Sequence, residues 1–205
     1  MKIVIVDFND SFTWNIFSIL KEMDKSLEIE VVHWLDFEIP TTQRSVVILG
    51  PGPGHPNEYK KIRNKIRAML KDDSLYLMGI CLGHQLIAQT MIFRIISSKS
   101  LVHGQCEQIT LPAWKGLFAK DLSGKTVEVQ RYNSLAVQEQ QKDKPELKTL
   151  VKRGEVLMMK YKNGVSYQFH PESVGTTCPS SFFEEALNFL YNRGDEHSTQ
   201  NHRSI

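Results

Sequence analysis

The chain has 205 residues, of which 41% are hydrophobic and 23% are charged, and its formal net charge at pH 7 is +2. This length and composition are those of one globular domain and exclude a disordered or low-complexity chain. The small net charge gives no strong attraction to nucleic acid or to an acidic membrane surface, so we expect neither as a partner.

Alternating strand and helix patterns fill the first part of the chain. Short β-branched apolar runs predict strands at 2–7, 29–34, 45–50 and 75–80. Apolar residues at helical spacing predict helices at about 11–20, 58–71 and 84–91, the first capped by Asp10 or Ser11. The segment PGPGHP at 51–56 is a loop, because prolines and glycines interrupt it. This alternation predicts a mostly parallel sheet with helices on both faces.

The second part of the chain has shorter strand patterns. They lie at 93–97, 107–111, 127–132, 156–161 and 165–170, and an amphipathic pattern at 181–191 predicts a closing helix. We therefore expect an additional antiparallel portion beside the parallel sheet. The fold class is α/β, with a single domain at 1–193 and a polar C-terminal tail at 194–205.

The N-terminus and the cysteines bear on localisation. Only four consecutive apolar residues precede Asp7, too few for a secretory signal, and no later segment is long enough to span a bilayer. The chain has three cysteines, which form neither a Cys-x-x-Cys pair nor an even disulfide framework. We expect a cytoplasmic protein whose thiols stay reduced.

Cys81 lies in GICLGHQ (79–85), between a predicted strand and a predicted helix. Gly79 and Gly83 flank it at two positions on either side, which is the pattern of a nucleophile elbow with cysteine in place of serine. The N–H groups at the start of the following helix would stabilise a thiolate and an oxyanion, and the elbow geometry assigns one of them to Leu82. The competing interpretation is a buried core cysteine, since free cysteine is often buried.

A thiol nucleophile needs a base, and QFHPES (168–173) contains a candidate. His170 and Glu172 lie two residues apart at a predicted strand end, so both side chains can face one side. Glu172 would then orient the imidazole of His170 while the imidazole takes and returns a proton. His84 is expected to pack or cap instead. No histidine and cysteine spacing fits a metal site, so we expect no metal.

Five segments together resemble the class I glutamine amidotransferases, in particular the group of anthranilate synthase component II and the aminodeoxychorismate synthase glutaminase. The segments are VDFNDSFTWN (6–15), PGPGHP (51–56), GICLGHQ (79–85), RYNSL (131–135) and QFHPES (168–173). The resemblance implies a flavodoxin-like fold and no cofactor. It also implies that the chain is a glutaminase subunit, which passes ammonia from L-glutamine to a chorismate-using synthase.

The resemblance also implies roles for single residues. Cys81 would form a glutamyl thioester, with His170 as acid and base and Glu172 as its orienter. The N–H of Gly54 would join that of Leu82 in the oxyanion hole. The glutamine would be held by Gly52, Pro53, Gly54, Gln85, Ser134 and Leu135.

The sequence departs from the family pattern after the helix that follows Cys81. Ile92 and Phe93 stand where the family usually has two glycines, so we expect this helix to end differently. Gly50 and Asn133 also replace the usual serine and histidine. Two alternatives stay open at this point, a γ-glutamyl peptidase-like thiol hydrolase and a non-catalytic regulatory subunit. The sequence does not distinguish a role in anthranilate synthesis from one in aminodeoxychorismate synthesis.

Overall fold

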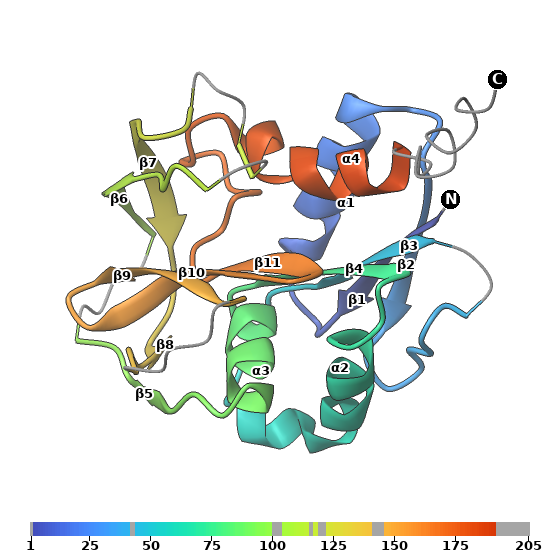
Figure 1. Cartoon of the computed structure of the whole chain (residues 1–205), viewed down its shortest axis with the longest axis horizontal. Coiled ribbons are helices and arrows are strands. Elements are labelled where there is room, and N and C mark those ends of the chain that lie inside the picture. The colour runs from blue at the N-terminus through green and yellow to red at the C-terminus, as the bar shows by residue number, and fades with distance from the viewer. Residues whose placement is uncertain are drawn as a thin grey trace, which may run out of the picture.

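The computed structural model describes residues 2–41, 44–99, 104–114, 117–118, 122–140 and 146–191. Its centre is a seven-stranded sheet in the order β2-β1-β3-β4-β11-β10-β9 (Figure 1). The strands are β1 (Lys2–Asp7), β2 (Glu28–His33), β3 (Ser45–Leu49), β4 (Leu75–Ile80), β9 (Lys148–Lys152), β10 (Glu155–Tyr161) and β11 (Gly164–Tyr167). The pairs from β2 to β11 are parallel, and β10 and β9 add an antiparallel edge. This arrangement confirms the predicted α/β class.

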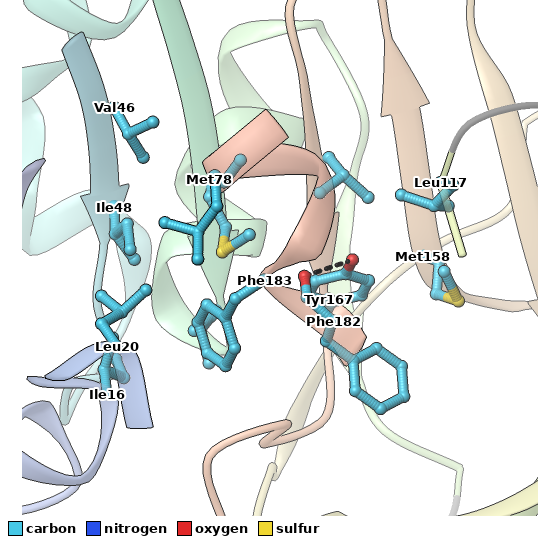
Figure 2. Packing of buried hydrophobic residues seen from close by; sticks show 14 of the residues in the cluster. Ile16, Leu20, Val46, Ile48, Met78, Leu117, Met158, Tyr167, Phe182 and Phe183 are labelled. Atoms are coloured by element: carbon cyan, nitrogen blue, oxygen red, sulfur yellow. Dashed lines mark hydrogen bonds between the residues drawn. The ribbon is translucent and has the colours of Figure 1, made fainter. Parts of the chain in front are cut away.

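Helices cover both faces of the sheet (Figure 1). On one face lie α1 (Thr13–Met23) and α4 (Glu184–Tyr191), which follows the 3₁₀ helix η2 (Pro179–Phe182). On the other lie α2 (Arg63–Met69) and α3 (Leu82–Thr90), with the 3₁₀ helix η1 (Pro56–Ile62) before α2. The sheet therefore separates two apolar layers. Figure 2 shows the α1 and α4 layer, where Ile16 and Leu20 pack near Ile48 and the Tyr167 hydroxyl donates to the Phe182 carbonyl at 3.1 Å.

Two small antiparallel sheets stand beside the main one. They pair β5 (Ile95–Ser97) with β8 (Leu135–Val137), and β6 (Gln105–Thr110) with β7 (Thr126–Arg131). The end of β7 meets the segment that follows β11, where Gln130 forms an isolated bridge with His170. The second, antiparallel part of the chain thus lies against the segment that follows the last parallel strand.

Several element boundaries differ from the sequence predictions. The helix expected at 58–71 is divided, because Tyr59 has non-helical angles (φ −102°, ψ 32°) and the segment before Arg63 winds as η1. The N-cap of α1 is Phe12, whose N–H donates to Asp10 Oδ1 at 2.9 Å, so Asp10 stabilises the preceding turn and is not the cap itself. The strand expected to reach residue 170 ends at Tyr167. The predicted tail at 194–205 lies outside the described residues.

The end of α3 corrects the expectation drawn from Ile92 and Phe93. Ile92 has φ +73°, its N–H donates to Gln89 O at 3.1 Å, and the N–H of Phe93 donates to Ala88 O at 2.9 Å. These two bonds form the left-handed turn with which glycine commonly ends a helix. The helix therefore ends in the usual way, with an isoleucine held in a backbone conformation that suits glycine.

Candidate active site

Cys81 lies at the turn between β4 and α3, at the carboxyl edge of the parallel strands. Its backbone has φ 52° and ψ −102°, a conformation that is uncommon for a residue with a side chain. A Cβ on Gly79 would come within 2.8 Å of the Gly83 carbonyl oxygen, and a Cβ on Gly83 would collide with the Leu49 carbonyl. The turn therefore needs both glycines. It holds the partly buried thiol of Cys81 above the sheet edge, as a nucleophile elbow does.

His170 and Glu172 form a buried pair beside this turn. His170 Nδ1 lies 2.7 Å from Glu172 Oε1, and the two residues are 2% and 3% exposed. The other ring nitrogen, Nε2, is buried and makes no hydrogen bond of regular geometry with the described residues. One nitrogen of the imidazole is thus held by a carboxylate while the other is left for a reacting group.

The electrostatics of His170 link it to Cys81. Burial alone disfavours the charged imidazolium, but attraction to the adjacent Cys81 sulfur in its thiolate form and to the Glu172 carboxylate outweighs burial. The pKa of His170 is therefore raised well above its usual value. A base that takes a proton from a thiol needs this affinity for protons. The structure thus brings together the three residues predicted as the triad.

Two aromatic rings enclose the imidazole. The ring of Phe12 lies 5.0 Å from the His170 ring and that of Tyr132 lies 5.1 Å from it, the latter edge to face. Phe12 and Tyr132 also contact each other, with centroids 5.2 Å apart. Phe12, which belongs to the segment at 6–15, and Tyr132 therefore pack on the His170 ring and restrict its rotation.

The loop at 51–56 lies against the start of α3. The N–H of Gly83 donates to Gly50 O at 3.2 Å, and a Cβ on Gly52 would come within 2.6 Å of Leu82 Cδ2. Gly54 has φ +75°, which favours glycine at this position. As the first residue of α3, Leu82 has an N–H without an intrahelical acceptor. The two expected oxyanion donors, Gly54 and Leu82, therefore lie on segments that contact each other beside Cys81.

Two of the residues expected to hold the substrate, Gln85 and Leu135, are linked to Cys81 through Gln168. Gln85 Nε2 donates to Leu135 O at 3.0 Å and to Gln168 Oε1 at 3.2 Å. Gln168 Nε2 in turn lies 3.9 Å from Cys81 Sγ. Ser134 is exposed, and its carbonyl accepts from Ser98 N at 2.8 Å. A hydrogen bond thus joins Gln85 to Leu135. Gly52, Pro53 and Gly54 lie together in the loop at 51–56, described above.

A family model described as "Glutamine amidotransferase class-I" matches residues 4–189, which include every residue of this site. The chain belongs to the class I glutamine amidotransferases.

Individual relatives of this amidotransferase refine the comparison. It is 31% identical to "Anthranilate synthase component 2" of Helicobacter pylori, over 93% of this chain and 98% of the relative. It is 29% identical to a "Putative aminodeoxychorismate synthase" of Schizosaccharomyces pombe, over 91% of this chain but 26% of that longer protein. The solved structure of a glutamine amidotransferase from Thermotoga maritima has the same fold, with a TM-score of 0.70, 15% identity, and coverage of 93% of this chain and 84% of that one.

His84 is excluded as the base of this amidotransferase. It is fully buried, with Nδ1 2.9 Å from Ser166 Oγ and Nε2 3.1 Å from Val156 O. Burial lowers its pKa to about 3, so the ring is neutral at pH 7. Both ring nitrogens are occupied by groups of the core. His84 therefore packs, as the sequence predicted.

Sequence reasoning missed two positions that support the amidotransferase site. Gln168 is fully buried and links Gln85 to Cys81, and its place two residues before His170 in a strand pattern is a signal that could have identified it. Arg131 is 2% exposed and pairs with Glu107 at 2.7 Å and Glu155 at 2.8 Å. Its Nε also donates to Asn133 Oδ1 at 3.0 Å, so Arg131 holds the segment that carries Leu135.

Proposed function

We propose that this chain is a glutaminase subunit, which hydrolyses L-glutamine to glutamate through a Cys81 thioester and delivers the ammonia to a chorismate-using synthase. The observation that carries the proposal is the buried contact of His170 Nδ1 with Glu172 Oε1 at 2.7 Å. It leaves Nε2 of the imidazole for the Cys81 thiol, and the pKa of His170 is raised, as a base for that thiol requires. Family membership and the names of the relatives support the choice of glutamine as the substrate.

The proposed reaction has two halves. In the first, His170 takes the proton of the Cys81 thiol, and the sulfur attacks the side-chain amide carbon of glutamine. The resulting oxyanion is stabilised by the N–H groups of Leu82 and Gly54, and the leaving nitrogen receives the proton from His170 and departs as ammonia. In the second half, His170 activates a water that attacks the thioester carbon. Collapse of this second intermediate releases glutamate and restores the thiol.

The remaining residues position His170 and the glutamine and take no part in the bonds that form and break. Glu172 keeps the proton-binding nitrogen of His170 directed at the reaction and stabilises its charged form. Gln85, Ser134 and Leu135 hold the glutamine on one side of Cys81, and Gly52, Pro53 and Gly54 line the other side. Direct delivery of ammonia suits this chemistry, because ammonia released into water at pH 7 is mostly protonated and no longer nucleophilic.

The proposed partner is a synthase that uses chorismate. The relatives named as anthranilate synthase component 2 and as a putative aminodeoxychorismate synthase support this class of partner, and both products remain within the proposal. We further propose that residues 1–193 form the amidotransferase domain, that 194–205 are a tail outside it, and that the chain acts in the cytoplasm. The three free cysteines suit a reducing compartment, and none of the described helices is long and apolar enough to cross a membrane.

Glutamate release from glutamine tests the function, measured for the chain alone and with its synthase. We expect Cys81→Ala to lose all measurable hydrolysis in both settings, and Cys106→Ala, which removes an exposed thiol, to retain the wild-type rate. Equal rates for wild type and Cys81→Ala in both settings would refute the proposal. Cleavage of γ-glutamyl peptides in preference to glutamine, with no need for a synthase, would instead support the thiol hydrolase.

A further inference from the structure

His170 and Glu172 lie on irregular backbone. Strand β11 ends at Tyr167, so the segment 170–176, which carries both side chains, is outside the hydrogen-bonded ladder of the main sheet. Its backbone groups therefore need other partners. Val174, near the middle of this segment, is fully exposed, so apolar packing does not hold it. The position of the His170–Glu172 pair thus depends on the polar contacts of the segment 170–176.

The side chain of Gln130, in β7, supplies contacts of this kind. Its Oε1 accepts one hydrogen bond from Ser173 Oγ and another from the Gly175 N–H, the latter at 3.1 Å. Its Nε2 donates to Gly104 O at 3.3 Å, which fixes the other end of the amide. One amide group thus ties Ser173 and Gly175 to the residue just before β6.

The backbone of Gln130 holds the same segment at its ends. Its carbonyl accepts from the His170 N–H at 2.9 Å, and its N–H donates to Thr176 Oγ1 at 3.0 Å. Thr176 Oγ1 donates in turn to the His170 carbonyl at 2.7 Å. Both backbone groups of His170 are therefore bonded, one to Gln130 directly and the other through Thr176.

The close approach of the segment to Gln130 depends on the glycine at 175. A Cβ there would lie 2.5 Å from Gln130 Oε1, well inside contact distance. The three nearest atoms belong to side chains, and the first two of them to the end of the Gln130 side chain. We therefore expect Gly175→Ala to displace the amide of Gln130 and to leave the backbone in place.

We propose that Gln130 is a positioning residue, whose amide holds the segment 170–176 so that His170 and Glu172 keep the geometry for proton transfer with Cys81. The proposal rests on the proposed function, because that function assigns the proton transfer to His170. A small shift of the segment moves the imidazole relative to the thiol, and the rate of reaction depends steeply on such placement. The residues proposed to hold glutamine form no hydrogen bond with the Gln130 amide, so substrate binding should not depend on it.

Gln130→Met tests the kinetic part, because it removes the amide and keeps the length of the side chain. Hydrolysis is measured in whichever setting wild type is active, alone or with the synthase, and kcat is referred to folded protein from unfolding curves. We expect kcat to fall about tenfold, the factor by which one or two neutral hydrogen bonds shift an equilibrium. KM should stay within about twofold, because the lost contact acts on the reacting groups and not on bound glutamine. Gly175→Ala should give the same pattern.

Amide hydrogen exchange, followed by mass spectrometry, reports the segment without any activity. In Gln130→Met and in Gly175→Ala we expect peptides that cover 170–176 to exchange about tenfold faster at their protected amides, because the Gly175 N–H loses its acceptor. Peptides from α2 should exchange as in wild type. This difference separates local release of the segment from a general loss of stability.

Gln108→Met is the matched control variant. Gln108 is exposed and lies on β6 opposite Glu128, in the same pair of strands as Gln130. The same substitution there should change neither kcat nor the exchange of 170–176.

Three results would overturn the proposal. They are an unaltered kcat in active Gln130→Met, an unaltered exchange of 170–176 in that variant, and a KM that rises as kcat falls, which would place Gln130 in glutamine binding. If wild type shows no Cys81-dependent hydrolysis in any setting, the proposed function fails, and the kinetic role of Gln130 fails with it. The exchange rates still decide in that case whether Gln130 holds the segment.

Discussion

At the scale of single residues, the site depends on how Glu172 and Cys81 change the protonation of His170. A buried imidazole normally has a lowered pKa, as His84 does in the same molecule. His170 is also buried, but it has an anionic partner on Nδ1 and a thiol beside it, and its pKa is raised. The two histidines have opposite pKa shifts because only His170 has Cys81 and a carboxylate beside its ring.

Glu172→Gln tests this account of the triad. The amide keeps the size of the side chain and an acceptor for Nδ1, but it removes the charge that favours the imidazolium, so the pKa of His170 should fall. We expect kcat to decrease by about 10²-fold and the descending limb of the kcat/KM profile to move to lower pH. The profile is measured with glutamine from about pH 6 to pH 10, and unfolding curves check that the variant is folded. A descending limb that stays in place would show that Glu172 does not set this pKa.

At the scale of elements, the strands were predictable where burial on both faces makes the whole run apolar. Val46–Leu49 of β3 is an example, since all four of its side chains are fully buried. The three-residue strand β8 was missed because its pattern is too short and its partner β5 is distant in the chain. At the site, residue types at the elbow and at His170 carried their own signal. Gln168 carried only a weak signal, its place two residues before His170. Arg131 carried none, because its role follows from the partners Glu107 and Glu155, which only the fold brings to it.

The end of α3 gives a prediction about one element. Ile92 is 72% exposed and has φ +73°. Its backbone conformation is therefore unfavourable, and burial of its side chain compensates for little of that cost. A left-handed conformation costs an L-residue about 1–2 kcal/mol, and the added freedom of glycine in the unfolded chain offsets part of the gain. We expect Ile92→Gly to stabilise the protein by about 1 kcal/mol and to raise Tm by about 2–4 °C. Ile92→Ala keeps a Cβ in the same conformation and should change stability little. Equal stabilisation by both variants would show that the left-handed backbone at Ile92 is not the source of the gain.

At the scale of the whole molecule, α3 is joined to the sheet by one polar side chain as well as by apolar packing. His84 contacts Ser166 of β11 through Nδ1 and Val156 of β10 through Nε2, at 2.9 and 3.1 Å. The ring is fully buried, so only unfolding of the core exposes it to protons. The free energy of unfolding of the entire domain therefore depends on the protonation of this one histidine.

The sign of this dependence follows from the lowered pKa. His84 titrates at about pH 3 in the folded protein and near 6.5 when unfolded. Between these values the unfolded chain binds one more proton, so stability is complete above pH 6.5 and falls by about 1.4 kcal/mol per pH unit below it. From pH 7 to pH 5, wild type should lose about 2 kcal/mol that His84→Gln does not lose. Urea unfolding at both pH values measures the difference, and His170, present in both proteins, cancels from it. Equal losses in the two proteins would show that His84 is not the group that links stability to pH.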